Sequence, residues 1–199
     1  MGSAKTIRLD SAGNSYTIVG LNSVVKLDSS GAKVWNAGYR GEIQLNDLEL
    51  ASDGLVAIGH KYTNTGKGCW FFGCVSIDGY AVKLDTEGEQ VWDKTYGNYP
   101  GGVNQFNDIE SGNDILIHNE CWGVAPSYAD DGTTHNGYVM SCGTGIEGCP
   151  FLGWYFGIFG IFTYIECLKD PRKIWRSLTI AFDLEGERVW SRMDSFQFE

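Results

Sequence analysis

The sequence predicts an all-β protein whose short antiparallel strands are organised in serial repeats. Gly is abundant at 27 residues and Pro is scarce at 4, a mixture typical of many short strands joined by tight turns. One hairpin pattern occurs three times, at residues 25–35, 82–92 and 180–190. The length suits one domain that spans residues 1–199, and 43% of the residues are hydrophobic, which is enough for a substantial core.

The repeated hairpin pattern combines an apolar strand end, an acidic turn that ends in Gly, and a strand that carries Val-Trp. Asp28, Asp85 and Asp183 each open a type I turn in this interpretation. The Gly that follows takes the positive φ that it adopts with least strain. We therefore expect the three aspartates to form turns and not to act in catalysis.

A second pattern, Gln-x-Asn-Asp-x-Glu, occurs at residues 44–49 and 105–110, and residues 6–20 form a degenerate copy with its turn. Each copy precedes a hairpin of the first kind, so the unit reads as four antiparallel strands in series. Such a unit is the blade of a β-propeller. The sequence predicts about three blades, at residues 3–40, 41–100 and 101–199, with a long hydrophobic insertion at 123–176 in the third.

Two of the units also resemble a known group of proteins. Lys-Leu-Asp-x-x-Gly-x-x-Val-Trp at residues 26–35 and 83–92 resembles the repeats of bacterial and algal β-propellers. More loosely, it is similar to the repeats of quinoprotein-like and WD-like propellers. The resemblance covers nearly all of the first two units and only the ends of the third. It implies a fold and a binding surface but no particular reaction, because the sequence has no adjacent cysteine pair of the kind found in quinoprotein dehydrogenases.

Three blades are too few for a closed ring, since propellers have about four to eight. An open arc would leave two sheet edges and an inner face uncovered. Residues 197–199 also resemble residues 105–107, the start of a blade. The sequence is then either a piece of a longer propeller or one of several copies that join edge to edge. We expect self-association as a homo-oligomer, for example two copies under C2 symmetry that together hold six blades.

The composition and the motifs exclude several function classes. A formal net charge of −10 argues against a nucleic-acid partner and against simple attraction to anionic lipid. The sequence contains no nucleophile elbow, phosphate loop, HExxH or EF-hand pattern. We expect no enzyme, no catalytic residue, no cofactor and no metal site.

The six cysteines lie outside the three hairpins. Disulfides that hold long loops would indicate an extracellular or other oxidising compartment, and six free thiols are the alternative. The spacing favours two local pairs, Cys69–Cys74 and Cys142–Cys149, which leaves Cys121 and Cys167 as the third. Zinc is less well supported, because no Cys-x2-Cys pair occurs and no His lies at ligand spacing.

Blade geometry places the connection between the second and third strands of each blade on one face, where binding residues concentrate on loops held by a rigid scaffold. This predicted interaction surface consists of aromatic residues from the second blade, from the insertion and from the residue directly before it: Trp70, Phe71, Phe72, Trp122, Trp154, Tyr155, Phe156, Phe159 and Phe162.

Residues 151–165 carry no charge. As a helix, the segment would span about 22 Å, short of a hydrocarbon core of ~30 Å. Three roles stay open: a cover for the propeller or an oligomer interface, a re-entrant or interfacial membrane anchor, and a pocket for an apolar ligand. Lys169, Arg172, Lys173 and Arg176 follow directly and support the membrane role.

Polar residues of the innermost strands are expected to face the central channel, namely Asn46, Asp47, Asn107 and Asp108. They would hold a cation or line a solvated polar channel. The three histidines are scattered, and His60 is expected to have a structural role.

The sequence therefore favours a non-catalytic structural or interaction module that assembles through blade edges and an aromatic loop face. One alternative is a membrane-associated subunit anchored by residues 151–165. Another is a glycan-binding or hydrolytic propeller that uses aromatic tips such as Trp70 and Trp122.

Overall fold

The protein is all-β in the part of the chain that the computed structural model describes, residues 4–64, 75–96, 118–145 and 175–194. These ranges contain twelve strands and no helix. Four strands form sheet A: β1 (Ala4–Leu9), β2 (Ser15–Val19), β3 (Ser23–Leu27) and β4 (Lys33–Gly38). Sheet B consists of β5 (Ile43–Ala51), β6 (Gly54–Asn64), β7 (Val75–Leu84) and β8 (Gln90–Tyr96). Sheet C consists of β9 (His118–Tyr128), β10 (His135–Gly145), β11 (Trp175–Asp183) and β12 (Arg188–Asp194).

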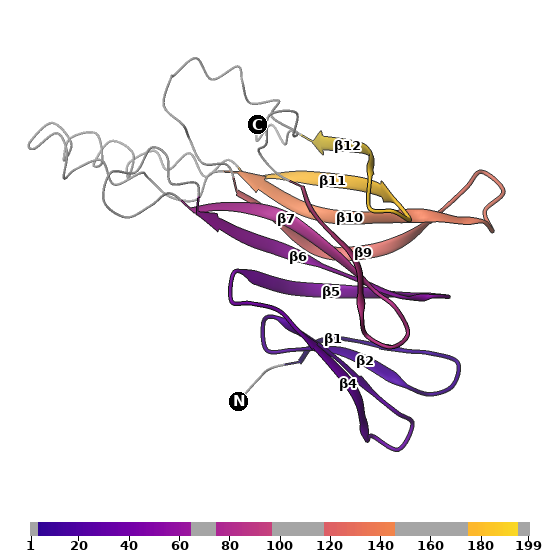
Figure 1. Ribbon diagram of the computed structural model, residues 1–199. Coiled ribbons are helices and arrows are strands. Elements are labelled where there is room, and N and C mark those ends of the chain that lie inside the picture. The colour runs from indigo at the N-terminus through magenta and orange to yellow at the C-terminus, as the bar shows by residue number, and fades with distance from the viewer. Residues whose placement is uncertain (1–3, 65–74, 97–117, 146–174, 195–199) are drawn as a thin grey trace, which may run out of the picture.

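Each sheet is an antiparallel meander in which strands that follow one another in the chain are hydrogen-bonded neighbours. The three sheets follow one another in space in chain order, with sheet B between sheets A and C (Figure 1). The first strands of the sheets lie next to one another, β1 against β5 and β5 against β9. The predicted all-β fold with three four-stranded antiparallel units is confirmed at this level.

The three predicted turns have the expected geometry. Gly31, Gly88 and Gly186 have φ values of 85°, 84° and 79°. In the first turn the Gly31 amide donates to the Asp28 carbonyl at 2.9 Å, and the Asp28 carboxylate accepts from the Ala32 amide at 2.9 Å. The other two turns have the same bonds. The aspartates are therefore turn formers, as predicted.

Sheet C differs from the prediction in its first two strands. Residues 119–128 and 135–145 were expected largely within an insertion at 123–176, yet they form β9 and β10, paired from His135↔Tyr128 to Gly145↔His118. A tight turn explains this hairpin, because the Asp131 carboxylate accepts the amides of Thr133 and Thr134, both at 2.8 Å. Residues 105–110, the expected first strand, lie outside the described residues, and β9 lies against β5 in the place expected for them.

Two hydrophobic cores hold the three sheets together. The core between sheets A and B contains Tyr16, Ile18 and Val24 from sheet A, packed against apolar residues of β5, β6 and β7. The core between sheets B and C contains Tyr138, Met140, Leu178, Ile180 and Phe182, with Val56, Ile58 and Ala81 from sheet B. Among the described residues, sheet B is thus covered on both faces, whereas sheets A and C are each covered on one face.

The core between sheets B and C also contains a disulfide between Cys121 and Cys142, with an S–S distance of 2.06 Å. The two residues lie opposite each other on β9 and β10. The predicted pairs Cys142–Cys149 and Cys121–Cys167 are therefore wrong, and so is the alternative of six free thiols. The error arose because the spacing argument placed both cysteines in connections and missed the strand pairing. Cys69, Cys74, Cys149 and Cys167 lie outside the described residues.

Candidate association surface

A tryptophan from sheet A reaches across to the last hairpin of sheet B. The Trp35 indole Nε1 donates to the Thr86 carbonyl at 3.0 Å. Its ring lies on Gly88, where an added Cβ would stand 2.6 Å from Trp35 Cδ2. Gly88 therefore serves two purposes, since it provides the positive φ of the turn and leaves room for the ring.

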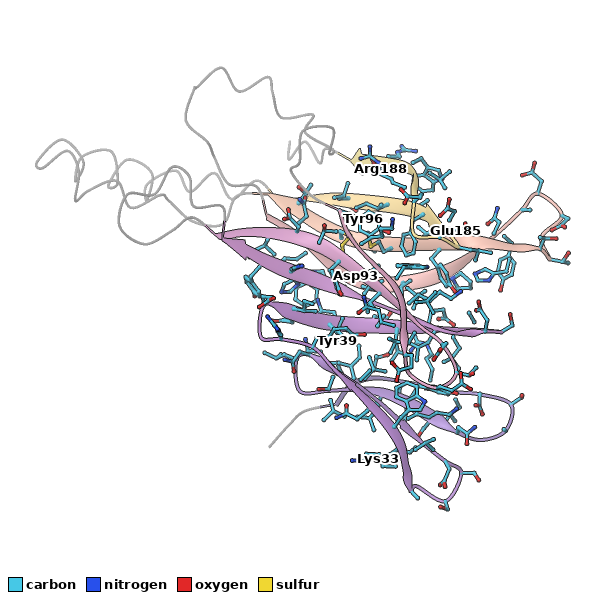
Figure 2. All side chains as sticks on the ribbon, in the orientation of Figure 1. Lys33, Tyr39, Asp93, Tyr96, Glu185 and Arg188 are labelled. Carbon is cyan, nitrogen blue, oxygen red and sulfur yellow. A yellow bond between two sulfur atoms is a disulfide. The ribbon has the colours of Figure 1, made fainter. Side chains whose placement is uncertain are left out.

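The same contact recurs between sheets B and C. The Trp92 Nε1 donates to the Leu184 carbonyl at 2.9 Å, and an added Cβ on Gly186 would stand 3.0 Å from Trp92 Cε3. The Tyr96 hydroxyl donates to the Gly186 carbonyl at 2.8 Å, and Figure 2 shows Tyr96 between these two sheets. We call this arrangement of an indole on a neighbouring hairpin the tryptophan–turn contact.

Both halves of a third such contact are exposed at the ends of the stack. In sheet C, Trp190 is 47% exposed, whereas Trp35 and Trp92 are only partly exposed. The Trp190 backbone pairs with Ala181, but no described residue has a hydrogen bond or ring contact with its indole. In sheet A, Gly31 is exposed, and no described atom lies within 4 Å of an added Cβ.

The outer face of sheet A carries apolar side chains that no described residue covers, alongside the polar residues Ser15, Thr17, Ser23 and Asn36. Ile7 and Leu9 are 62% and 67% exposed. Val19, Val25 and Leu27 lie on the same face and are exposed or half-buried. We call these five residues the open face of sheet A.

Strand register shows what these positions do in the other two sheets. Leu27 directly precedes the turn aspartate, as Leu84 and Phe182 do in sheets B and C. Leu84 is fully buried and Phe182 is 1% exposed.

Ile7 pairs with Thr17 in the same register in which Leu48 pairs with Ala57, and Leu48 is fully buried. The open face of sheet A thus uses the positions through which sheet B packs on sheet A and sheet C packs on sheet B.

The outer face of sheet C carries smaller and more polar side chains. Val139, Ser141 and Thr179 occupy the positions that Val56, Ile58 and Ala81 hold in sheet B. Trp190 is the large apolar side chain of this face.

The polar residues expected at the channel connect all three sheets. The Asp47 carboxylate accepts from Arg8 Nη2 at 3.2 Å, from the Thr6 hydroxyl at 2.9 Å and from the Val124 amide at 3.1 Å. Asn46 is buried, accepts from Lys5 Nζ at 2.7 Å, and donates to the Cys121 carbonyl at 2.7 Å. The other two residues of this predicted channel set, Asn107 and Asp108, lie outside the described residues.

His60 is buried beside Asn46, and its structural role stays a prediction. Its Nδ1 lies 3.4 Å from Asn46 Nδ2, and its Nε2 lies 3.2 Å from the Tyr62 hydroxyl. Trp122 packs near it, with ring centroids 6.1 Å apart.

Trp122 lies on strand β9 and is 55% exposed, so its expected place in a loop is wrong. The rest of the predicted aromatic surface lies outside the described residues: Trp70, Phe71, Phe72, Trp154, Tyr155, Phe156, Phe159 and Phe162. The segment 151–165 lies there too. In the ranges that are described, no helix has the length and apolarity needed to cross a membrane.

Four tyrosines in the described ranges lie in or against the two hydrophobic cores. Burial raises the pKa of Tyr39, Tyr80, Tyr96 and Tyr138 above the usual range, so these hydroxyls stay protonated. Those ranges hold no group of three His, Cys, Asp or Glu side chains placed to bind a metal.

Sequence reasoning missed the tryptophan–turn contact, although a signal was present. Trp follows the turn Gly at the same spacing in all three hairpins. However, the spacing alone does not indicate that the ring contacts the neighbouring sheet. No known protein family matches the chain, and a comparison with curated proteins finds no match. The described residues thus define an all-β protein of three four-stranded antiparallel sheets in series.

Proposed function

We propose that the chain is a non-catalytic interaction module that self-associates end to end, with sheet A of one copy covering sheet C of the next. The observation that carries this proposal is the open face of sheet A. Its apolar positions correspond to those that are buried at both internal interfaces between sheets.

Burial of this face supplies the driving force. Full burial of one Val, Leu or Ile side chain contributes roughly 1.5–3 kcal/mol, and Ile7 and Leu9 are both more than half exposed. The outer face of sheet C is less apolar than an internal interface. We therefore expect an association weaker than the internal packing, and one that depends on concentration.

The assembly that we propose is a β-propeller made of two copies. Three four-stranded meanders per chain would give six blades, within the range of about four to eight for closed propellers. The resemblance of the Lys-Leu-Asp-x-x-Gly-x-x-Val-Trp units to propeller repeats supports the same arrangement. The Cys121–Cys142 disulfide supports an oxidising compartment, such as the cell exterior.

A double variant of the open face tests this function. Ile7→Thr/Leu9→Thr replaces two exposed apolar side chains by polar ones of strand-forming type. Sedimentation velocity across a concentration series is expected to show dimers of the parent chain. The dissociation constant of the dimer should be at least ~10-fold higher for the variant.

Val91→Thr is the matched control. Val91 is 57% exposed on β8, an edge strand of sheet B, and sheet B lies at neither end of the stack, so its substitution should leave the dissociation constant unchanged. A parent chain that sediments as a monomer at every concentration would refute the proposal.

A further inference from the structure

We infer that Trp190 of one copy makes the third tryptophan–turn contact, on the Asp28–Gly31 turn of a second copy. The inference rests on the proposed self-association and names the contact that gives it direction and register. A second copy of this chain is the only partner that it requires.

The two internal contacts follow one rule. The indole belongs to the fourth strand of the earlier sheet, and the accepting carbonyl belongs to the residue directly after the turn aspartate of the later sheet. Thr86 follows Asp85 in the first contact, and Leu184 follows Asp183 in the second. The turn Gly lies under the ring both times.

Applied to the open ends, the rule specifies the atoms. Trp190 lies on β12, the fourth strand of sheet C, at the position of Trp35 and Trp92. The residue after Asp28 is Ser29. We therefore expect Trp190 Nε1 to donate to the Ser29 carbonyl, with the indole ring on Gly31.

The turn of sheet A has the conformation that the contact needs. Gly31 has a φ of 85°, against 84° for Gly88, and the same turn hydrogen bonds are formed. What differs is the cover: the Trp35 ring lies on Gly88, and open space lies above Gly31. Sheet A thus presents a formed acceptor site.

One chain does not make this contact within itself. Lys33 begins the strand after the Gly31 turn, and Arg188 begins the strand that carries Trp190. The two residues lie at opposite ends of the stack in Figure 2. In both internal contacts the indole belongs to one sheet and the turn to the next sheet in the chain. Since no described sheet follows sheet C, we expect its indole to meet sheet A, the first sheet, of another copy. In a dimer with C2 symmetry both such contacts form, and no half is left over.

Three variants test the inference. Trp190→Phe keeps an aromatic ring but removes the N–H donor, and two bonds are lost per dimer. We expect the dissociation constant of the dimer to rise roughly 5-fold to 100-fold. Trp190→Ala removes the ring as well and should raise it further, because buried Trp side chains dominate interfaces. Gly31→Ala places a methyl group where the ring would lie and should weaken the dimer at least ~10-fold.

Gly132→Ala is the matched control for Gly31→Ala. Gly132 also has a positive φ, 68°, and open space around an added Cβ, but it lies in the β9–β10 turn. Both substitutions strain the backbone of a turn, and only Gly31→Ala should change the dissociation constant. Circular dichroism of each variant establishes that it is folded.

A mixing experiment tests the direction of the contact. In a dimer of Trp190→Ala with Gly31→Ala, one interface has both parent residues and the other has neither. Each variant alone has two damaged interfaces. The mixture is therefore expected to dimerise more tightly than either variant alone.

The outcomes separate the inference from the proposed function. If the parent chain dimerises and Trp190→Phe, Trp190→Ala and Gly31→Ala all keep its dissociation constant, the inference is wrong and self-association stands. A mixture no tighter than its components would also overturn it. If the parent chain is a monomer at every concentration, both fail. The inference and the proposed function are both supported if the folded variants dimerise more weakly than the parent chain and their mixture dimerises more tightly than either variant alone.

Discussion

At each boundary between sheets, a tryptophan of one sheet packs its indole ring on a turn glycine of the next sheet. Trp35 and Trp92 each bind a backbone carbonyl of the next hairpin and cover its glycine. A Trp N–H that is half-buried needs an acceptor, and the turn carbonyl provides one without any side-chain entropy cost on the accepting side. This makes the contact independent of which residue follows the aspartate, and Thr86 and Leu184 indeed differ in chemistry.

Substitution of Gly88 by Ala should cost more stability than the same change at Gly31. Both residues have φ near 85°, so each Ala pays about 1–2 kcal/mol for the left-handed backbone. Only at Gly88 would the new methyl group meet the Trp35 ring, at 2.6 Å, which adds roughly 1–3 kcal/mol for overpacking. Urea denaturation below the concentration at which the protein associates measures both free energies of unfolding. Equal losses would contradict the assigned role of the ring.

The Asp131 turn should weaken in acid. The Thr134 hydroxyl, followed by the amides of Thr134 and Thr133, lowers the pKa of Asp131 to about 2. Since the pKa of Asp in unfolded chains is about 3.9, this carboxylate stabilises the fold at pH values above about 4, and its contribution is lost as the pH falls toward 2.

The thermal midpoint of the parent chain should therefore exceed that of Asp131→Ala at pH 6, and the difference should shrink between pH 4 and pH 2. A difference that stays constant over this range would show that the ionised carboxylate does not support the turn.

At the scale of elements, β5 is the strand that connects the three sheets. Asp47 binds Arg8 and Thr6 of β1 on one side and the Val124 amide of β9 on the other. Asn46 does the same through Lys5 and the Cys121 carbonyl. These bonds hold the first strands of the sheets at a fixed spacing, while the two hydrophobic cores supply most of the cohesion.

Asp47→Ala should therefore destabilise the fold by roughly 2 kcal/mol, because it leaves the Val124 amide and the Arg8 guanidinium without this acceptor. Glu49→Ala is the control. Glu49 binds Arg8 at 3.3 Å in a more exposed place, and its loss should cost at most about 1 kcal/mol. Equilibrium denaturation compares the two, and equal effects would contradict the connecting role of Asp47.

The elements that sequence reasoning predicted correctly are those fixed by local chemistry. An aspartate, a glycine three residues later and flanking apolar strands determine a hairpin wherever they occur, so the turns at Asp28, Asp85 and Asp183 could be located. The turn at Asp10 forms the same bonds to Gly13 and Asn14 but was not matched to the others, because no Val-Trp follows it.

The elements that were missed depend on pairing between distant residues. The likeness of residues 105–110 to residues 44–49 shifted the expected first strand of sheet C, and β9 and β10 were assigned to an insertion. The Cys121–Cys142 disulfide depends on that pairing and was therefore missed too. In the tryptophan–turn contact, Trp35 binds Thr86, which is 51 residues away in the sequence. The residues around Trp35 do not indicate such a distant partner.

At the scale of the whole molecule, three sheets in series leave one end with an apolar face and a formed turn, and the other with an exposed tryptophan. We propose that the two ends fit each other, because all three sheets are four-stranded antiparallel meanders with the same Asp-x-x-Gly turn. A repeated interface that closes on itself gives a ring of fixed size, whereas one that does not close gives an open chain of copies. The proposed contact therefore specifies a closed ring of two copies and not an open chain of copies.

The native mass of the unmodified chain, measured by native mass spectrometry over a concentration series, tests this central claim most directly. If two copies close a ring, the mass rises from the 22.0 kDa of one chain to twice that value and then stays constant. A mass that remains at one chain throughout, or that grows without limit as the concentration rises, would contradict it.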